Sequence, residues 1–137
     1  MFHCNNIKNV IEPVVQFKEN NKLYYIDLSK DKFHLGGSSF GQINNKIGKE
    51  TPTIKNAEYF KSVFNTIQQL INEDYILAGH DISSGGLITT LLEMCFPEQN
   101  IGLEIDLTSI GEKDSIKLLF AENSGIVIQS NKSDFAE

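Results

Sequence analysis

The chain has 137 residues, of which 40% are hydrophobic and 22% are charged, and its formal net charge is −6. This length and composition fit one globular domain with a substantial core and argue against disorder. The 12 basic residues are scattered and outnumbered by 18 acidic ones. We therefore expect no nucleic-acid partner, because binding to a phosphate backbone needs clustered lysine and arginine.

The sequence also argues against a membrane or a secretory setting. No apolar run approaches the roughly 20 residues of a membrane span, and the first nine residues contain no apolar signal-peptide core. Cys4 and Cys95 form no Cys-x-x-Cys motif, and we expect Cys95 to be a reduced core residue. These features predict a cytoplasmic location with no membrane partner.

The first third of the sequence predicts strands and a glycine–serine turn. Residues 10–17 are apolar around Pro13, which fits an edge strand or a lead-in segment. Residues 23–28 are aromatic and branched, as in a strand. The glycine–serine stretch 35–42 then opens a short helix that should end near Gly48.

The middle of the sequence predicts a helix, a strand and a second helix. Asn56 should cap a helix whose apolar residues recur at intervals of three and four, and this stripe is expected to face the core. Residues 76–81 form the strand. The second helix runs from Leu87 to about Phe96, and because it is apolar on nearly all sides it should be deeply buried.

The last third predicts a strand, a helix and a final strand. Residues 101–107 alternate strictly between apolar and polar, which is typical of a strand with one wet face. Asp114 should cap a short helix, Gly125 should end the turn after it, and residues 126–129 form the last strand. The predicted fold class is therefore α/β (α+β), a three-layer α/β sandwich with a mixed sheet, in a single domain 1–137.

The junction after strand 76–81 is the main candidate site. Asp81 and Ser83 stand just before Gly85 and Gly86, which open the apolar helix. The first turn of a helix has N–H groups without internal partners and partial positive charge, so it suits a phosphate. Asp81 could then hold the Mg²⁺ that accompanies a nucleotide. The alternative is a plain helix cap with a tight turn. It stays open because the sequence contains neither a Walker motif nor G-x-G-x-x-G, the motifs that would indicate a phosphate site.

Three further groups are weaker candidates. Gly36, Gly37 and Ser38 could face a substrate phosphate, although a tight turn before a helix explains them equally well. His80 adjoins the main site, but a histidine at a strand end is more often structural than a catalytic base. Glu93 could hold a neighbouring loop.

Four motifs stand in an order typical of one family. The motifs are Leu23-Tyr24-Tyr25-Ile26-Asp27-Leu28, Leu35-Gly36-Gly37-Ser38-Ser39-Phe40-Gly41-Gln42, Gly79-His80-Asp81-Ile82-Ser83-Ser84-Gly85-Gly86-Leu87 with Leu92-Glu93-Met94, and Leu119-Phe120-Ala121-Glu122-Asn123-Ser124-Gly125. In this order they resemble the second C-terminal-type domain of the large phosphoribosylformylglycinamidine synthases of purine biosynthesis, in the aminoimidazole ribonucleotide synthetase superfamily. The resemblance covers residues 10–130.

The resemblance implies an ATP- and glutamine-dependent carbon–nitrogen ligase that makes formylglycinamidine ribonucleotide from formylglycinamide ribonucleotide. Its partners would be the other domains of a longer chain, including a glutaminase domain that supplies ammonia, and its ligands a nucleotide and the ribonucleotide substrate. This chain would be one domain of that ligase, inactive alone and without a catalytic residue of its own. A non-catalytic nucleotide-binding or scaffolding module is the alternative.

The resemblance also implies roles for two residues of the main site. The Asp-x-Ser of the family motif falls on Asp81 and Ser83. In large members this aspartate belongs to the Mg²⁺ shell of a bound nucleotide, ATP or ADP, and the serine contacts the nucleotide at what resembles an auxiliary structural ADP site. Gly85 and Gly86 complete the nucleotide-binding motif.

The sequence departs from the commoner family pattern at two positions. Ser84 stands where the family often has aspartate, which weakens any expectation of a second carboxylate at the junction. Asn123 stands where the family often has glutamate, which leaves Glu122 as the only carboxylate of its motif.

Overall fold

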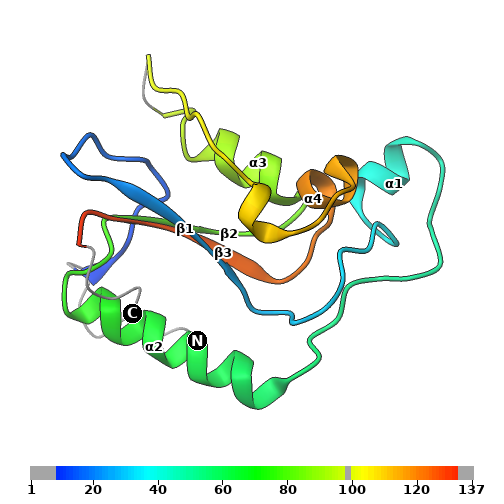
Figure 1. Ribbon diagram of the computed structural model, residues 1–137, viewed down its shortest axis with the longest axis horizontal. Coiled ribbons are helices and arrows are strands. Elements are labelled where there is room, and N and C mark those ends of the chain that lie inside the picture. Colours follow the sequence, from blue (N-terminus) through cyan, green and yellow to red (C-terminus); the bar gives the residue numbers. More distant parts are fainter. Residues whose placement is uncertain (1–8, 98–99, 133–137) are drawn as a thin grey trace.

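The computed structural model describes residues 9–97 and 100–132, and Figure 1 shows their arrangement. The first half contains strand β1 (Lys22–Asp27), helix α1 (Ser39–Ile43) and helix α2 (Ala57–Asn72). The second half contains strand β2 (Ala78–Asp81), helix α3 (Gly86–Glu93), the short 3-10 helix η2 (Thr108–Ile110), helix α4 (Ser115–Phe120) and strand β3 (Gly125–Ser130). Strands therefore form within the predicted ranges 23–28, 76–81 and 126–129, to within two residues, and each predicted helix is present with some differences at its ends.

The strands form one sheet with β3 at its centre, in the order β1-β3-β2. Ile128 of β3 lies opposite Tyr24 of β1 on one side and Gly79 of β2 on the other, and both pairings are antiparallel. The α/β class is confirmed. The sheet is antiparallel throughout the described residues, where the sequence predicts a mixed one, because the segments 10–17 and 101–107 add no strand to it.

The sheet lies between two helical layers, as the sequence predicts. Figure 1 shows α2 on one face and α3 and α4 on the other. Because side chains alternate along a strand, Val127 packs with Leu87 and Met94 on the α3 side, whereas Ile128 packs with Ile67 on the α2 side. The core of the domain is thus split into two apolar clusters by the sheet.

The strand predicted at 101–107 is wrong, and its alternation holds only in part, because Ile105 is 38% exposed. Leu103 and Leu107 pack against the cluster on the α3 side, while Glu104 is exposed. At its end Asp106 accepts hydrogen bonds from the Thr108 N–H (2.9 Å) and the Thr108 hydroxyl (2.7 Å), which turn the chain into η2. Alternation reports which side chains face the core, but a strand also needs a neighbouring backbone to pair with.

Residues 10–17 form the lead-in segment, the second of the two alternatives. Val15 N–H donates to the Met94 carbonyl at 3.0 Å, just beyond α3. The Gln129 side chain accepts from Gln16 N–H and donates to the Gln16 carbonyl, both at 2.8 Å. Gln129 is 1% exposed, so this exchange satisfies a buried amide and attaches the segment to the sheet.

The helices differ from prediction mainly at their ends. Asn56 caps α2 as predicted, with its side-chain oxygen 2.9 Å from the Tyr59 nitrogen. Helix α1 ends at Ile43 and α3 at Glu93, both earlier than predicted. Helix α3 is less buried than predicted: Leu87 and Leu91 are buried, but Leu92 is 47% exposed, because only one side of the helix packs on the sheet. Burial raises the pKa of the Cys95 thiol just after it. None of the helices in the described ranges combines the length and apolar character needed to cross a bilayer.

Candidate functional site

The junction between β2 and α3 presents three side chains with oxygen atoms to solvent. Asp81 is the last residue of β2, and its side chain is 74% exposed. Ser83 and Ser84, two and three residues after Asp81, are exposed. Their hydroxyls make no hydrogen bond within the described part of the chain. The carboxylate and the hydroxyls are therefore accessible to a ligand.

The backbone that carries the Asp81 side chain is held in place. The Asp81 carbonyl accepts a hydrogen bond from the Thr90 hydroxyl at 3.0 Å, and His80 Nδ1 lies 2.8 Å from the same oxygen. Because a carbonyl oxygen can only accept, Nδ1 must be the donor. His80 Nε2 lies 3.2 Å from the Glu93 carboxylate, so both side chains are engaged within the domain.

The start of α3 already holds a carboxylate from the chain itself. Glu122 Oε1 accepts hydrogen bonds from Gly85 N–H at 2.9 Å and from Ser39 N–H at 2.8 Å. Burial by itself would raise the pKa of Glu122, but the hydrogen bonds from Gly85 and Ser39 outweigh it, and the pKa lies below its ordinary value. Gly86 N–H donates to the Ser83 carbonyl at 3.1 Å. Both glycine N–H groups proposed for a nucleotide are thus already used inside the domain.

The two glycines are required by the backbone. Gly85 and Gly86 have φ values of 91° and 74°, in the left-handed region that side chains disfavour. A Cβ on Gly86 would also lie 2.7 Å from the Leu119 carbonyl oxygen. A tight turn packed against α4 therefore explains these glycines, and their predicted contact with a nucleotide stays a prediction.

The second glycine–serine junction is equally occupied. Gly36 N–H donates to Glu50 O at 2.9 Å, and Gly37 N–H donates to Ile47 O at 2.7 Å. Ser38 is 2% exposed; its hydroxyl donates to Leu35 O at 2.7 Å and accepts from Gly41 N–H at 3.1 Å, which makes it the cap of α1. The tight-turn alternative accounts for all these bonds, and the phosphate role of Gly36, Gly37 and Ser38 stays a prediction.

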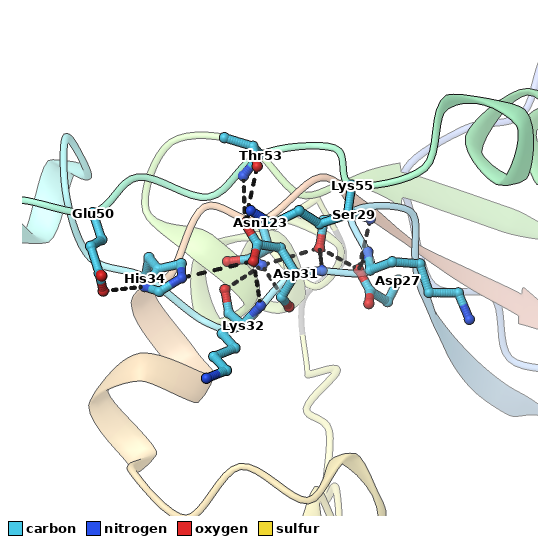
Figure 2. A network of polar contacts seen from close by, with 10 residues as sticks. Asp27, Ser29, Asp31, Lys32, His34, Glu50, Thr53, Lys55 and Asn123 are labelled. Atoms are coloured by element: carbon cyan, nitrogen blue, oxygen red, sulfur yellow. Dashed lines mark hydrogen bonds and ion pairs between the residues drawn. The ribbon is translucent and has the colours of Figure 1, made fainter.

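A polar network beside this junction has no counterpart among the sequence-based candidates (Figure 2). The Asp31 side chain is 6% exposed and accepts from Thr53 N–H at 3.0 Å, while Lys55 Nζ lies 3.4 Å away. Burial opposes ionisation of Asp31, yet hydrogen bonds from Thr53, Lys32 and Lys55 lower its pKa. The network ties residues 29–34 to residues 50–55, and the aspartate between two lysines was its only sequence signal.

The same network explains the departure at Asn123. This side chain is 2% exposed, and its Nδ2 donates to Ser29 Oγ and to the Lys32 carbonyl, both at 3.1 Å. An ionised glutamate has no donor and could not make these bonds. The asparagine is therefore matched to the acceptors of its own neighbourhood.

The residues fit a magnesium ion that is shared with other ligands. Mg²⁺ usually keeps several waters and takes one or two carboxylates together with phosphate oxygens. Asp81 provides one accessible carboxylate. No group of three or more His, Cys, Asp and Glu side chains that could hold a metal occurs in residues 9–97 and 100–132. A metal here would need oxygen atoms from a nucleotide or from another domain.

The comparisons with known proteins agree with the motifs. A family described as AIR synthase related protein, C-terminal domain, matches residues 18–137. A probable phosphoribosylformylglycinamidine synthase, chloroplastic/mitochondrial, of Arabidopsis thaliana is 38% identical over 132 residues, 96% of this chain and 9% of that protein. The phosphoribosylformylglycinamidine synthase of Schizosaccharomyces pombe is 42% identical over 118 residues, 86% of this chain and 9% of that protein.

A third relative is matched over similar shares of the two chains. The phosphoribosylformylglycinamidine synthase of Dictyostelium discoideum is 38% identical over 138 residues, 96% of this chain and 10% of that protein. The chain thus spans about a tenth of the length of these relatives. From the matched family and the fold it follows that the chain belongs to the AIR synthase related protein, C-terminal domain family.

Proposed function

We propose that this chain works as a domain of a phosphoribosylformylglycinamidine synthase. The overall reaction would form formylglycinamidine ribonucleotide from formylglycinamide ribonucleotide, with ATP and glutamine, in purine biosynthesis. Relatives that carry this name, at 36–42% identity over most of the chain, support the proposal. The other domains of the ligase, including a glutaminase domain, would be its partners.

Within that ligase the β2–α3 junction would contribute to a Mg-nucleotide site. The observation that carries this role is the Asp81 side chain, which is 74% exposed although its backbone carbonyl is fixed by Thr90 and His80. Asp81 would bind the metal and Ser83 would donate to a phosphate oxygen. The bound Mg²⁺ would neutralise the phosphate charge, while the chain's own residues hold the carboxylate at a constant position.

A structural nucleotide site is the second candidate function. Two observations favour it: Ser84 replaces an aspartate that is common in the family, and Glu122 already accepts the hydrogen bond of the Gly85 N–H at the start of α3. With one exposed carboxylate at its turn, the junction would be better equipped to hold a nucleotide than to activate it. The chain would then stabilise the assembly, and turnover would take place elsewhere.

Product formation separates these functions. We would express the ligase that contains this domain and measure formylglycinamidine ribonucleotide with ATP and glutamine, for the parent, for Asp81→Asn and for the control Asp74→Asn. The ligase assignment fails if the parent makes no product. A catalytic contribution predicts a lower kcat for Asp81→Asn at normal folded content, whereas a structural site predicts loss of folded protein with kcat unchanged per folded molecule.

Two smaller expectations belong to the same proposal. The 137-residue chain alone would be inactive and would bind Mg-ADP weakly, because among the described residues Asp81 provides one exposed carboxylate at the turn, and the Glu122 carboxylate is already hydrogen-bonded there. The cytoplasmic location predicted from the sequence remains a prediction. One relative carries plastid and mitochondrial locations in its name, so fractionation of the source cells would be needed to test it.

A further inference from the structure

We propose that the outer edge of β1 binds an extended segment of the same polypeptide, from outside the 137 residues, as an added strand. This inference rests on the proposed function in one respect, that the chain is one domain of a longer protein. The matched relatives support that condition, because the chain spans about a tenth of their length. The binding surface consists of the outer edge of β1 together with Phe17 and Ile105.

The hydrogen-bond pattern of β1 identifies the backbone groups of this edge. In the described residues β1 has one neighbouring strand, β3, with which it pairs in antiparallel register. One step beyond that ladder, Leu28 N–H donates to the Ser124 carbonyl at 2.9 Å. Because bonded and non-bonded pairs alternate along an antiparallel ladder, Leu23 and Tyr25 direct their N–H and C=O groups away from β3. These groups have no hydrogen-bond partner in the part of the chain that the structure describes.

The opposite edge of the sheet is closed by the domain itself. On β2, Gly79 N–H donates to the Glu12 carbonyl at 3.2 Å, and the Asp81 carbonyl accepts from the Thr90 hydroxyl at 3.0 Å. Along β1 the register is continuous without a bulge, the strand contains no proline, and only its two ends are charged. Soluble proteins normally protect an edge strand by such devices, so the unprotected edge of β1 is suited to pairing with another strand.

An apolar hollow beside this edge fits the side chains of an added strand. The hollow has a volume of about 400 Å³, and Leu23 of β1 lines it together with Phe17, Leu103 and Ile105. Phe17 is 83% exposed and Ile105 is 38% exposed, so both present apolar surface to solvent. Apolar surface gathered at one place indicates an interaction site. Alternate side chains of the added strand enter the hollow while its backbone pairs with β1.

The walls of the hollow are held in place by the domain. Asn21 Nδ2 donates to the Gln16 carbonyl at 2.7 Å, just before Phe17 in the chain. The buried Gln129 side chain donates to the same carbonyl at 2.8 Å. The surface is therefore formed before the added strand arrives, which lowers the entropy cost of binding.

The charges around the hollow define the chemistry of the added segment. Glu104 and Asp106 line the hollow, and Lys22 is the one basic residue of its lining. Glu104 is exposed and forms no ion pair in the described residues. The added segment therefore combines alternating apolar side chains with a basic side chain near Glu104. A second copy of the domain fits less well, because each copy has a formal charge of −6.

Hydrogen exchange in the ligase that contains this domain tests the proposal. Mass spectrometry with electron-transfer fragmentation would follow the single amides of β1. We expect the outward amides, Leu23 and Tyr25, to be as protected as the amides of Tyr24 and Ile26, which face β3. Rapid exchange at the two outward amides beside slow exchange at the two inward ones would overturn the proposal.

Phe17→Asp should release the added strand and leave the domain folded, because Phe17 is 83% exposed. Exchange should become at least about tenfold faster at the two outward amides of β1 and stay unchanged at the two inward ones. Ile47→Asp is the matched control, since Ile47 is 78% exposed and lies outside the hollow. This control should leave all four amides unchanged, and equal acceleration in both variants would overturn the proposal.

A photoreactive side chain identifies what pairs with β1. Phe17 would be replaced by p-benzoyl-phenylalanine in a mixture of isotope-labelled and unlabelled ligase. A cross-link within one polypeptide, to a segment outside the 137 residues, supports the proposal, whereas a cross-link between two copies overturns it. Product formation, measured on the same ligase, separates the two proposals. Absence of product contradicts the ligase assignment alone, and an unprotected edge in an active ligase overturns strand addition alone.

Discussion

Glu122 Oε1 accepts a hydrogen bond from the Gly85 N–H at 2.9 Å, at the position where a phosphate would meet the start of α3. The same oxygen accepts from Ser39 N–H at 2.8 Å, so one carboxylate joins the two glycine–serine junctions. The N-terminus of a helix favours a negative group, and here the chain supplies that group. A phosphate at the junction would therefore rely on a metal ion bound to Asp81 and on hydrogen bonds from the exposed serine hydroxyls.

Replacing Glu122 by glutamine should loosen both junctions together. Glutamine keeps the shape and one acceptor but loses the charge, and charge-assisted hydrogen bonds are stronger than neutral ones. We expect a loss of about 1–2 kcal/mol in the free energy of unfolding. Hydrogen exchange should accelerate at the Ser39 and Gly85 amides, as measured by NMR.

Glu104→Gln is the matched control for this change. Glu104 is exposed and makes no hydrogen bond or ion pair in the described residues. Its substitution should alter the free energy of unfolding by less than about 0.5 kcal/mol. Equal effects of Glu122→Gln and Glu104→Gln, with unchanged exchange at Ser39 and Gly85, would show that the carboxylate does not hold the junctions.

A methyl group on Gly86 should destabilise the domain strongly. Its φ of 74° disfavours alanine, and the added Cβ would lie 2.7 Å from the Leu119 carbonyl oxygen and 2.8 Å from Phe120 backbone atoms. Strain of this kind costs about 1–3 kcal/mol before any backbone shift is counted. Gly102→Ala is the control, because its Cβ would meet nothing within 4 Å. Similar urea midpoints for the two variants would contradict the packing described for Gly86.

Stability should decline in acid through two carboxylates. The pKa values of Glu122 and Asp31 lie below their ordinary values in the folded domain. The folded state therefore binds fewer protons than the unfolded state, and stability rises with pH in this range. The contribution is complete above the ordinary carboxyl pKa and is lost as the pH falls through the lowered values. As the pH is lowered, the urea midpoint of Glu122→Gln should fall less steeply than that of the parent. Identical pH profiles for the two proteins would contradict the contribution assigned to Glu122.

Thr90 should act on nucleotide binding through Asp81 without touching the ligand. Thr90→Val removes the hydroxyl that donates to the Asp81 carbonyl at 3.0 Å and keeps the branched shape. In the ligase we expect weaker Mg-ADP binding together with faster hydrogen exchange around β2. Thr66→Val is the control, since Thr66 is exposed on α2 and makes its hydrogen bond to Ser62 O within that helix. An unchanged Mg-ADP affinity in Thr90→Val would show that this bond does not position Asp81.

Elements whose signals are local could be predicted from the sequence. The caps Asn56 and Asp114 and the aromatic strand β1 depend on residues near one another in the chain, and all are present. The stripe of α2 also faces the core, except that Phe64 is 45% exposed. The strand at 101–107 failed because alternation predicts only which side faces the core. Whether an extended segment pairs depends on a neighbour far away in sequence.

In the candidate site, too, features set by local sequence could be predicted and features set by distant residues could not. The exposure of Asp81 and Ser83 at the end of β2 follows from a local strand–turn–helix pattern. The bonds from Glu122 to Gly85 and Ser39 join residues 37 and 83 positions apart, and no local pattern reports them. The hydrogen bonds of Asn123 to Ser29 and Lys32 belong to the same class, since they depend on the assembled fold.

Calorimetric titration of Mg-ADP into the ligase that contains this domain tests the central proposal most directly. The account predicts that Asp81→Asn weakens Mg-ADP binding by at least about tenfold, because the metal loses its carboxylate ligand. Asp74→Asn, at the exposed end of α2, should bind with the affinity of the parent. If Asp81→Asn binds Mg-ADP as tightly as the parent does, Asp81 is no metal ligand and the proposed nucleotide site at the β2–α3 junction is contradicted.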